Sequence, residues 1–290
     1  SNALWAERML SDLAPNVREL PLTRTQDKLN PAHHLDLSDY PLPVLPTDPT
    51  APSPAGELAD RPAPTTTIRF ENQAASAGLE FSYFNGAPRD RQSRRMYEFN
   101  GGGVGVIDYD QDGRPDLFLT QGSDWPPDSG SGVYSDRLFR NKRGKRFHDV
   151  TPDARVMDRQ FSAGLAVGDL DNDGFPDIYV ANIGGNRLLM NNGDGTFRDE
   201  TEATGTAGDD WSTSCAIADI NADGLPDLYV VNYLSGPDVF ERLCRDEDDR
   251  VRSCSPREFP AAQDRLYLNQ GDGTFLDATS SIGIEVPDGK

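Results

Sequence analysis

The sequence predicts an all-β fold made of repeated four-stranded units, on three observations. Nearly identical acidic segments, DYDQDGRPD, DLDNDGFPD and DINADGLPD, begin at residues 108, 169 and 219. Each is followed by a variant of a second segment: DRLFRN at 136–141, NRLLMN at 186–191 and DRLYLN at 264–269. Two of these continue into NNGDGTF and NQGDGTF, whose Asp-Gly pairs are typical of a β-hairpin turn.

Strand-like residues lie on both sides of each acidic segment. GVGVI, GLAVG and CAIA precede the segments, and DLFLT, DIYVAN and DLYVVN follow them. Such β-branched and aromatic runs are typical of strands, and no sustained helical period occurs between 68 and 290. One unit is therefore strand, acidic loop, strand, strand, hairpin, strand.

The unit recurs with a period of roughly 50–60 residues, which is typical of the four-stranded blades of a β-propeller. The repeated unit extends beyond these segments. In all three units, a Phe lies six residues after the final Asn of the second segment, and a Thr lies four residues after that Phe. These residues are Phe147 and Thr151, Phe197 and Thr201, and Phe275 and Thr279. We expect about three to four blades in this chain, preceded by a strand at 67–72.

The acidic segments predict cation sites. Oxygen-bearing side chains occupy the first, third, fifth and ninth positions, and a glycine, which permits a sharp turn, occupies the sixth. Ca²⁺ needs six to eight oxygen ligands, and the backbone carbonyl at the seventh position adds one more. The predicted ligands are Asp108, Asp110, Asp112, Arg114 and Asp116; Asp169, Asp171, Asp173, Phe175 and Asp177; and Asp219, Asn221, Asp223, Leu225 and Asp227.

Two other interpretations of these loops were weighed. An EF-hand requires a Glu at the twelfth position and flanking helices, but Leu119, Val180 and Val230 stand there between predicted strands. Asp, Asn and Gly also favour ordinary turns. Three loops in the same register, each crowding carboxylates that would otherwise repel one another, favour cation binding. We expect about three Ca²⁺ sites, with Mg²⁺ less favoured, and the weakest site at Asn221.

The acidic loops, the DRLYLN strand and the GDGTFLDAT hairpin resemble the FG-GAP/VCBS calcium-binding propeller repeat over about residues 68–283. The resemblance is greatest to the ASPIC/UnbV group, which includes cartilage acidic protein-like and bacterial secreted proteins. It implies a propeller with calcium in its loops and, for the family, about seven blades. The chain departs from the pattern at RGKRF, which replaces the first GDGTF hairpin. Either a larger seven-bladed ring or a small four-bladed ring would accommodate these units.

Composition excludes some partners. The chain has 28 basic and 48 acidic residues, a net charge of −20 and a pI of about 4.4. A nucleic-acid backbone needs a basic face, and anionic lipid is disfavoured for the same reason. No apolar run is long enough to span a bilayer, so we expect no membrane insertion.

Three regions are predicted. Residues 1–3 (SNA) are typical of a tag-cleavage scar. Residues 4–66 hold a short helix within 4–20 and a Pro-rich linker with eight prolines at 41–64. Residues 67–290 hold the repeats. His33 and His34 fit an exposed linker pair better than a metal site.

Cysteine usage favours an oxidising compartment. Cys244 and Cys254 bracket the charged segment RDEDDRVRS inside an insertion of 28 residues, and we expect a disulfide between them. Cys215 aligns with Leu165 and Val104, so we expect it to face the core. A disulfide together with weak calcium sites predicts an extracellular or periplasmic protein.

Two functions remain open. The first is a secreted binding or scaffold module for a protein or glycan, with structural calcium; Trp125 and Tyr134 would either contact a partner or pack on the blade. The second is an enzyme or an accessory protein of enediyne-type biosynthesis, a role that the UnbV resemblance implies. His148 aligns with Arg198 and Leu276, so no residue is marked as a catalytic base. An enzyme should have a concave site with converging polar groups. The oligomeric state is left open.

Overall fold

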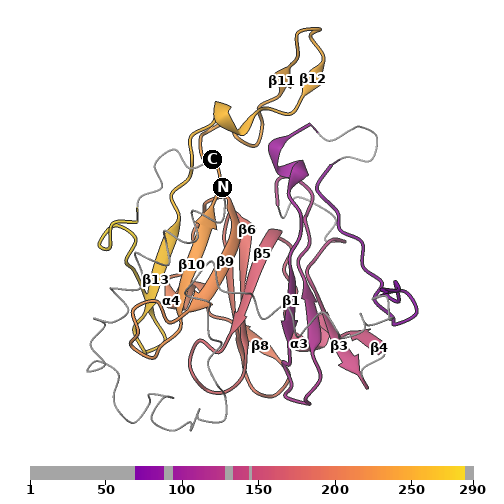
Figure 1. Cartoon of the computed structure of the whole chain (residues 1–290), viewed down its shortest axis with the longest axis vertical. Helices are drawn as coiled ribbons and strands as arrows, with labels where there is room; N and C mark the ends of the chain where they lie inside the picture. Colours follow the sequence, from indigo (N-terminus) through magenta and orange to yellow (C-terminus); the bar gives the residue numbers. More distant parts are fainter. Residues whose placement is uncertain (1–68, 88–93, 128–132, 144–145, 285–290) are drawn as a thin grey trace, which may run out of the picture. The chain divides into compact units, whose positions relative to one another are not determined.

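The computed structural model describes residues 69–87, 94–127, 133–143 and 146–284 (Figure 1). The chain divides into two compact units, Ser1–Glu71 and Asn72–Lys290. The predicted scar, helix and linker lie outside the described residues. The strand predicted at 67–72 is wrong where it is described, because residues 69–72 form no strand and pair with none of the described strands.

The second compact unit contains three four-stranded antiparallel sheets, one for each predicted repeat, and this confirms the all-β prediction. The first sheet comprises β1 (Val104–Ile107), β2 (Asp116–Leu119), β3 (Arg137–Lys142) and β4 (Arg146–Asp149). The second comprises β5 (Phe161–Gly168), β6 (Asp177–Ile183), β7 (Arg187–Asn191) and β8 (Phe197–Asp199). The third comprises β9 (Ser212–Ala218), β10 (Asp227–Asn232), β13 (Arg265–Asn269) and β14 (Phe275–Asp277).

The repeated Thr has a structural role at the end of each repeat. The backbone N–H groups of Leu138, Leu188 and Leu266 in the third strands donate to Thr151, Thr201 and Thr279 Oγ1 at 2.9, 2.8 and 3.0 Å. The first two of these threonines also begin single helical turns, α3 (Thr151–Ala154) and α4 (Thr201–Thr204). The Thr therefore fixes the chain as it leaves the fourth strand.

The sheets stack face to face in chain order (Figure 1). Phe118 and Leu138 of the first sheet pack against Val180 of the second, and Tyr179 on the other face of the second packs against Leu228 of the third. All seven residues of β6 are buried, because β6 is covered on both faces. The described strands close no barrel. None of the described helices is long and apolar enough to cross a membrane.

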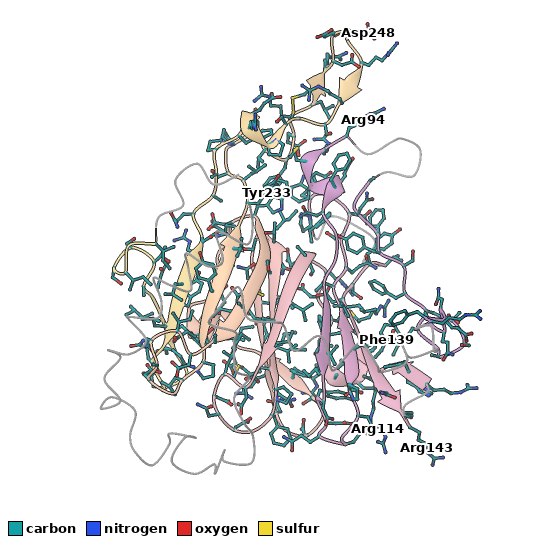
Figure 2. All side chains as sticks on the ribbon, in the orientation of Figure 1. Arg94, Arg114, Phe139, Arg143, Tyr233 and Asp248 are labelled. Carbon is teal, nitrogen blue, oxygen red and sulfur yellow. A yellow bond between two sulfur atoms is a disulfide. The ribbon has the colours of Figure 1, made fainter. Side chains whose placement is uncertain are left out.

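A third hydrophobic cluster lies where the insertion of the third repeat meets the first repeat. It joins the 3₁₀ helix η2 (Met96–Phe99) to Phe161, Trp211 and Phe259. The insertion carries β11 (Cys244–Arg245), β12 (Val251–Arg252) and the 3₁₀ helix η3 (Pro256–Glu258). The β11–β12 hairpin projects beyond the sheets, with Asp248 at its tip (Figures 1 and 2).

Trp125 and Tyr134, the two aromatic residues considered as partner contacts, pack against other residues of the chain. The Trp125 ring stacks on Tyr97 with centroids 4.4 Å apart, and its Nε1 donates to Glu241 Oε1 at 3.1 Å. The Tyr134 ring stacks on Phe84 at 3.9 Å. Of the two interpretations of these side chains, these contacts favour packing.

Candidate metal centre

The three acidic loops join the first and second strands of the three sheets and share one backbone conformation. The fourth and sixth residues of each loop have positive φ: Gln111 (53°) and Gly113 (80°), Asn172 (58°) and Gly174 (94°), and Ala222 (60°) and Gly224 (88°). A Cβ added at the sixth position would meet nothing within 4 Å. Glycine is therefore favoured there by its left-handed backbone and not by a lack of space around it.

The first aspartate of each loop closes the turn. Asp169 accepts hydrogen bonds from the backbone N–H groups of Asp173 (3.1 Å) and Gly174 (2.9 Å), and Asp108 and Asp219 do the same in their loops. The seventh residue, Phe175 in the second loop, donates its N–H to Asp173 Oδ1 at 2.8 Å. These hydrogen bonds define the turn of each loop. Ligation by the carbonyls of Arg114, Phe175 and Leu225 stays a prediction.

The ninth aspartates differ from the other predicted ligands, because Asp116, Asp177 and Asp227 are buried. Asp177 Oδ1 accepts the backbone N–H of Asn191 at the end of the third strand, and Oδ2 accepts that of Leu170 in the loop, both at 2.8 Å. Asp116 and Asp227 repeat this pattern. The ninth position therefore anchors each loop to the third strand of its own sheet.

Two of the three loops bring carboxylates together. Oxygens of Asp108, Asp110 and Asp116 lie within 4.8 Å of one another, and so do oxygens of Asp169, Asp171 and Asp177. The fifth-position aspartates belong to neither group. The third loop, which carries Asn221 and an exposed Asp219, forms no such group of three carboxylates.

The electrostatics of these groups favour a cation. Burial, with smaller contributions from the charges of Asp171 and Asp173, raises the pKa of Asp177 to about 7, although its two backbone hydrogen bonds lower it. Burial likewise raises the pKa of Asp116 to about 6, with Asp110 and Asp112 contributing. A bound dication would stabilise the charged form of these carboxylates.

The donor set fits a hard divalent cation. All the side-chain ligands are oxygens, which suits Ca²⁺ or Mg²⁺ better than a transition metal. Within the described residues, no donor reaches the buried Asp110 Oδ1, although Oδ2 of the same carboxylate is paired. That oxygen therefore has a free lone pair at the first loop.

The first loop also carries positive charge, from Arg114 within it and from Arg140, whose approach the sequence did not reveal. Arg140 Nη2 lies 2.5 Å from Asp110 Oδ2 and 3.4 Å from Asp112 Oδ2, and Arg114 Nη1 lies 2.6 Å from Asp112 Oδ2. Met190 stands at the position of Arg140 in the second repeat. The first loop is therefore partly neutralised by the protein itself.

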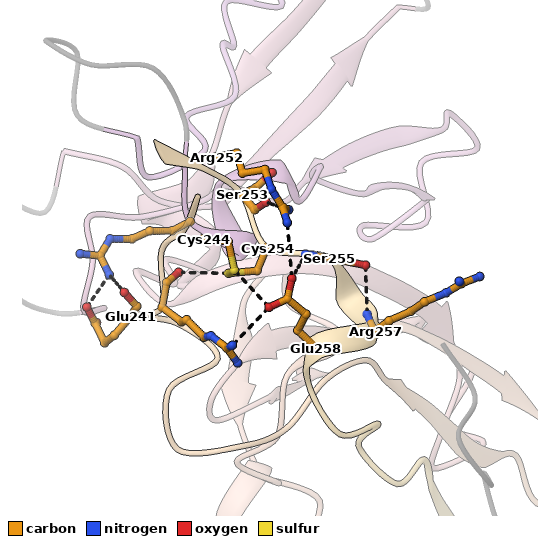
Figure 3. The surroundings of a disulfide bond; sticks show 10 residues. Glu241, Cys244, Arg252, Ser253, Cys254, Ser255, Arg257 and Glu258 are labelled. Carbon is orange, nitrogen blue, oxygen red and sulfur yellow. Dashed lines mark hydrogen bonds and ion pairs between the residues drawn. A yellow bond between two sulfur atoms is a disulfide. The ribbon is translucent and has the colours of Figure 1, made fainter. Parts of the chain in front are cut away.

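The remaining candidate residues are the three cysteines and His148. The Sγ atoms of Cys244 and Cys254 are 2.12 Å apart, at the distance of a disulfide (Figure 3). Cys215 faces the cluster between the second and third sheets, as predicted, and burial raises its pKa to about 12. His148 lies exposed on β4. Within the described residues, neither carboxylate group of the loops includes a histidine or a cysteine.

Taken together, the stacked four-stranded antiparallel sheets with an acidic loop in each define a blade-like repeat protein. The FG-GAP-like repeat family matches residues 108–180 and again residues 169–230. Each match begins at the first aspartate of one loop and ends in the strand after the next loop. No curated protein matches the chain.

Proposed function

We propose that the chain is a calcium-binding part of a β-propeller that acts as a secreted binding or scaffold module, with calcium in a structural role. The observation that carries the proposal is the pair of carboxylate groups in the first and second loops, in repeats that match the FG-GAP-like family. The cation supplies positive charge between two strands of a blade. The residues that hold it are the loop ligands predicted from the sequence, and similarity to the ASPIC/UnbV group supports the same role.

The blade faces support a ring larger than three units. The second residue of each loop is an apolar side chain. Tyr109 in the first loop and Leu170 in the second are 5% and 2% exposed, because the next sheet covers them, whereas Ile220 in the third loop is 48% exposed. At the opposite end, Val104 and Val106 of β1 are also exposed. We propose that further blades cover both faces in a larger propeller.

Secretion is proposed from the disulfide and from the expected weakness of the calcium sites. Disulfides persist in oxidising compartments. Extracellular calcium modules bind at about 10⁻⁴–10⁻³ M, a concentration range that the cytosol does not supply. A protein or glycan is the proposed partner, because the charged β11–β12 hairpin projects freely from the sheets.

The enzyme alternative receives less support from the cavities. A cavity of about 480 Å³ is lined by Trp125, Tyr97, Arg95 and Glu241. Of its three charged lining residues, Arg95 and Glu241 pair with each other, and Trp125 Nε1 also donates to Glu241. In an active site, polar side chains would point into the cavity toward the substrate and would not be paired with each other. We therefore favour the binding module.

Calcium titration of the full chain tests the proposal. After removal of bound metal with a chelator, added Ca²⁺ should raise the unfolding midpoint, because each filled site adds about 2.7 kcal/mol to the free energy of unfolding at a hundredfold excess over Kd. Asp171→Ala should reduce this gain more than Asn221→Ala, because Asp171 is an anionic ligand in a carboxylate group. Mg²⁺ at the same concentration is the control cation. An unfolding midpoint that responds neither to chelator nor to Ca²⁺ would overturn the assignment.

A further inference from the structure

The Asn that ends the third strand of the second and third repeats reaches beyond its own sheet. Asn191 Nδ2 donates to the carbonyl of Pro176 in the second loop (3.2 Å) and to the carbonyl of Tyr109 in the first loop (2.9 Å). Asn269 Nδ2 repeats this one unit later. It donates to Pro226 O in the third loop (3.0 Å) and to Leu170 O in the second (2.8 Å). Each of these two side chains therefore bridges its own loop and the preceding one.

The ninth aspartates make these bridges continuous. The backbone N–H of Asn269 donates to Asp227 Oδ1, and the N–H of Ile220 in the third loop donates to Asp227 Oδ2, both at 2.9 Å. In the second repeat, Asp177 joins Asn191 and Leu170 in the same way. A chain of hydrogen bonds thus runs from the first loop through the second to the third.

The residues that bridge the loops in this chain of hydrogen bonds are buried. Asn191, Asp177 and Asn269 are buried, as are the loop residues Tyr109 and Leu170. Buried polar groups lose a full desolvation cost if a partner moves away, so such a chain resists independent motion of its parts. Leu170 lies between the predicted ligands Asp169 and Asp171, so a displacement of its backbone displaces both.

We propose that Asn191 and Asn269 couple neighbouring loops, so that a cation bound in one loop raises the affinity of the next. This inference rests on the proposed calcium function. The two asparagines are positioning residues, because they hold the loop backbone and not the cation. Binding orders one loop, the bridge transmits that order to the carbonyl in the neighbouring loop, and the neighbour then needs less ordering to bind.

The link between the second and third loops gives the cleaner test. The first and second loops share an additional exposed bond, from Gln111 Nε2 to Gly174 O at 2.6 Å. Asn172 stands at the position of Gln111 in the second loop, and within the described residues its side chain makes no corresponding bond to the third loop. Asn269 is therefore the residue to change.

The test uses calcium alone as the probe and the full chain. Amide NMR of Gly174 and Gly224 reports the second and third loops separately, because each N–H donates to the first aspartate of its own loop. Asp171→Ala empties the second loop, which the Gly174 resonance verifies. We expect the calcium affinity read at Gly224 to fall about fivefold, within the usual range of coupling between sites.

The sign of this effect separates coupling from simple charge effects. The emptied second loop keeps three carboxylates without a cation, whereas the filled loop has four with a dication. Charge alone would therefore tighten binding in the third loop. Coupling is reciprocal, so Asp223→Ala should lower the affinity read at Gly174 by the same factor.

Asn269→Leu should remove the effect, with Asn269→Ser as the milder variant if Leu impairs folding. Asn141 is the matched control: it holds the same position in the first repeat and donates to Pro115 O of its own loop at 2.9 Å. Asn141→Leu should leave the coupling between the second and third loops intact. Unchanged or tighter binding at Gly224 in Asp171→Ala overturns the coupling and leaves the calcium sites standing. Absence of any calcium response at both glycines in the wild type overturns the calcium function as well.

Discussion

Removing the Cys244–Cys254 disulfide tests how the insertion of the third repeat is held. The bridge spans a sequence separation of ten and closes the base of the β11–β12 hairpin. Both sulfurs are buried in the cluster that contains Leu234 and Phe259. Beside it, Glu258 pairs with Arg242 at 3.2 Å and with Arg252 at 3.7 Å (Figure 3). The perturbation is the double variant Cys244→Ser, Cys254→Ser.

The expected magnitude follows from the closed loop. A cross-link over about ten residues restricts the unfolded chain by about 2.7 kcal/mol. The two ion pairs of Glu258 are partly exposed and add about 0.5 kcal/mol each, so they do not replace the bridge. For a unit of this size, each kcal/mol shifts the midpoint by about 2–4 °C, which predicts a loss of about 5–10 °C.

The assay combines calorimetry with limited trypsin digestion. Arg245, Arg250 and Arg252 are exposed in the hairpin and become cleavable when its base opens. Reductant should reproduce the effect of the double variant in the wild type. Cys215→Ser, which alters the free thiol, should leave the response to reductant unchanged. If neither the midpoint nor the cleavage rate changes on reduction, packing of the insertion holds the hairpin and the entropic reasoning is refuted.

Two further predictions concern charged groups. Arg140 reaches from β3 to the first loop, where its guanidinium pairs with Asp110. Arg140→Met, which copies Met190 of the second repeat, should raise the calcium affinity of the first loop several-fold, because a dication would no longer compete with the guanidinium. Titration calorimetry that finds equal or weaker binding would contradict this. Asp136 is fully buried, and its burial, followed by the charge of Asp158, raises its pKa well above the usual range. The folded state therefore holds the Asp136 proton more tightly than the unfolded state does. The stability that this proton contributes is fully present at acid pH and is lost as the pH rises through the folded-state pKa. Asp136→Asn, which copies Asn186 of the second repeat, should gain stability relative to wild type between pH 5 and pH 8 in urea unfolding, and an equal difference at both pH values would refute the assignment.

The sequence predicted most of the fold because the repeat is local. Strand runs, the acidic loops and the Asp-Gly hairpins all depend on residues close in the chain, and the sheets formed as expected. The single-turn helices at Thr151 and Thr201 are too short for a helical period to reveal them. The strand expected at 67–72 failed because local propensity does not supply a pairing partner.

The site was predicted less completely, because its key contacts join different repeats. The sequence spacing predicted Asp177 as one of four equivalent side-chain ligands, whereas the structure shows that it is buried and bonded to the third strand. Arg140 approaches the first loop from a strand more than twenty residues away. The Asn at the end of DRLFRN, NRLLMN and DRLYLN was visible as a repetition, but the sequence did not show that Asn191 and Asn269 also bond to the preceding loop.

The ninth aspartate connects metal binding to the architecture of the sheet. Asp177 belongs to a carboxylate group and also holds the last backbone N–H of β7. A cation in the loop would favour the ionised carboxylate, and an ionised carboxylate accepts the stronger hydrogen bond from that N–H. Loss of calcium should therefore loosen the pairing of β6 with β7 as well as the exposed loop. Since Asn191 then carries the change to the carbonyl of Tyr109, the effect of one empty loop extends into the neighbouring sheet.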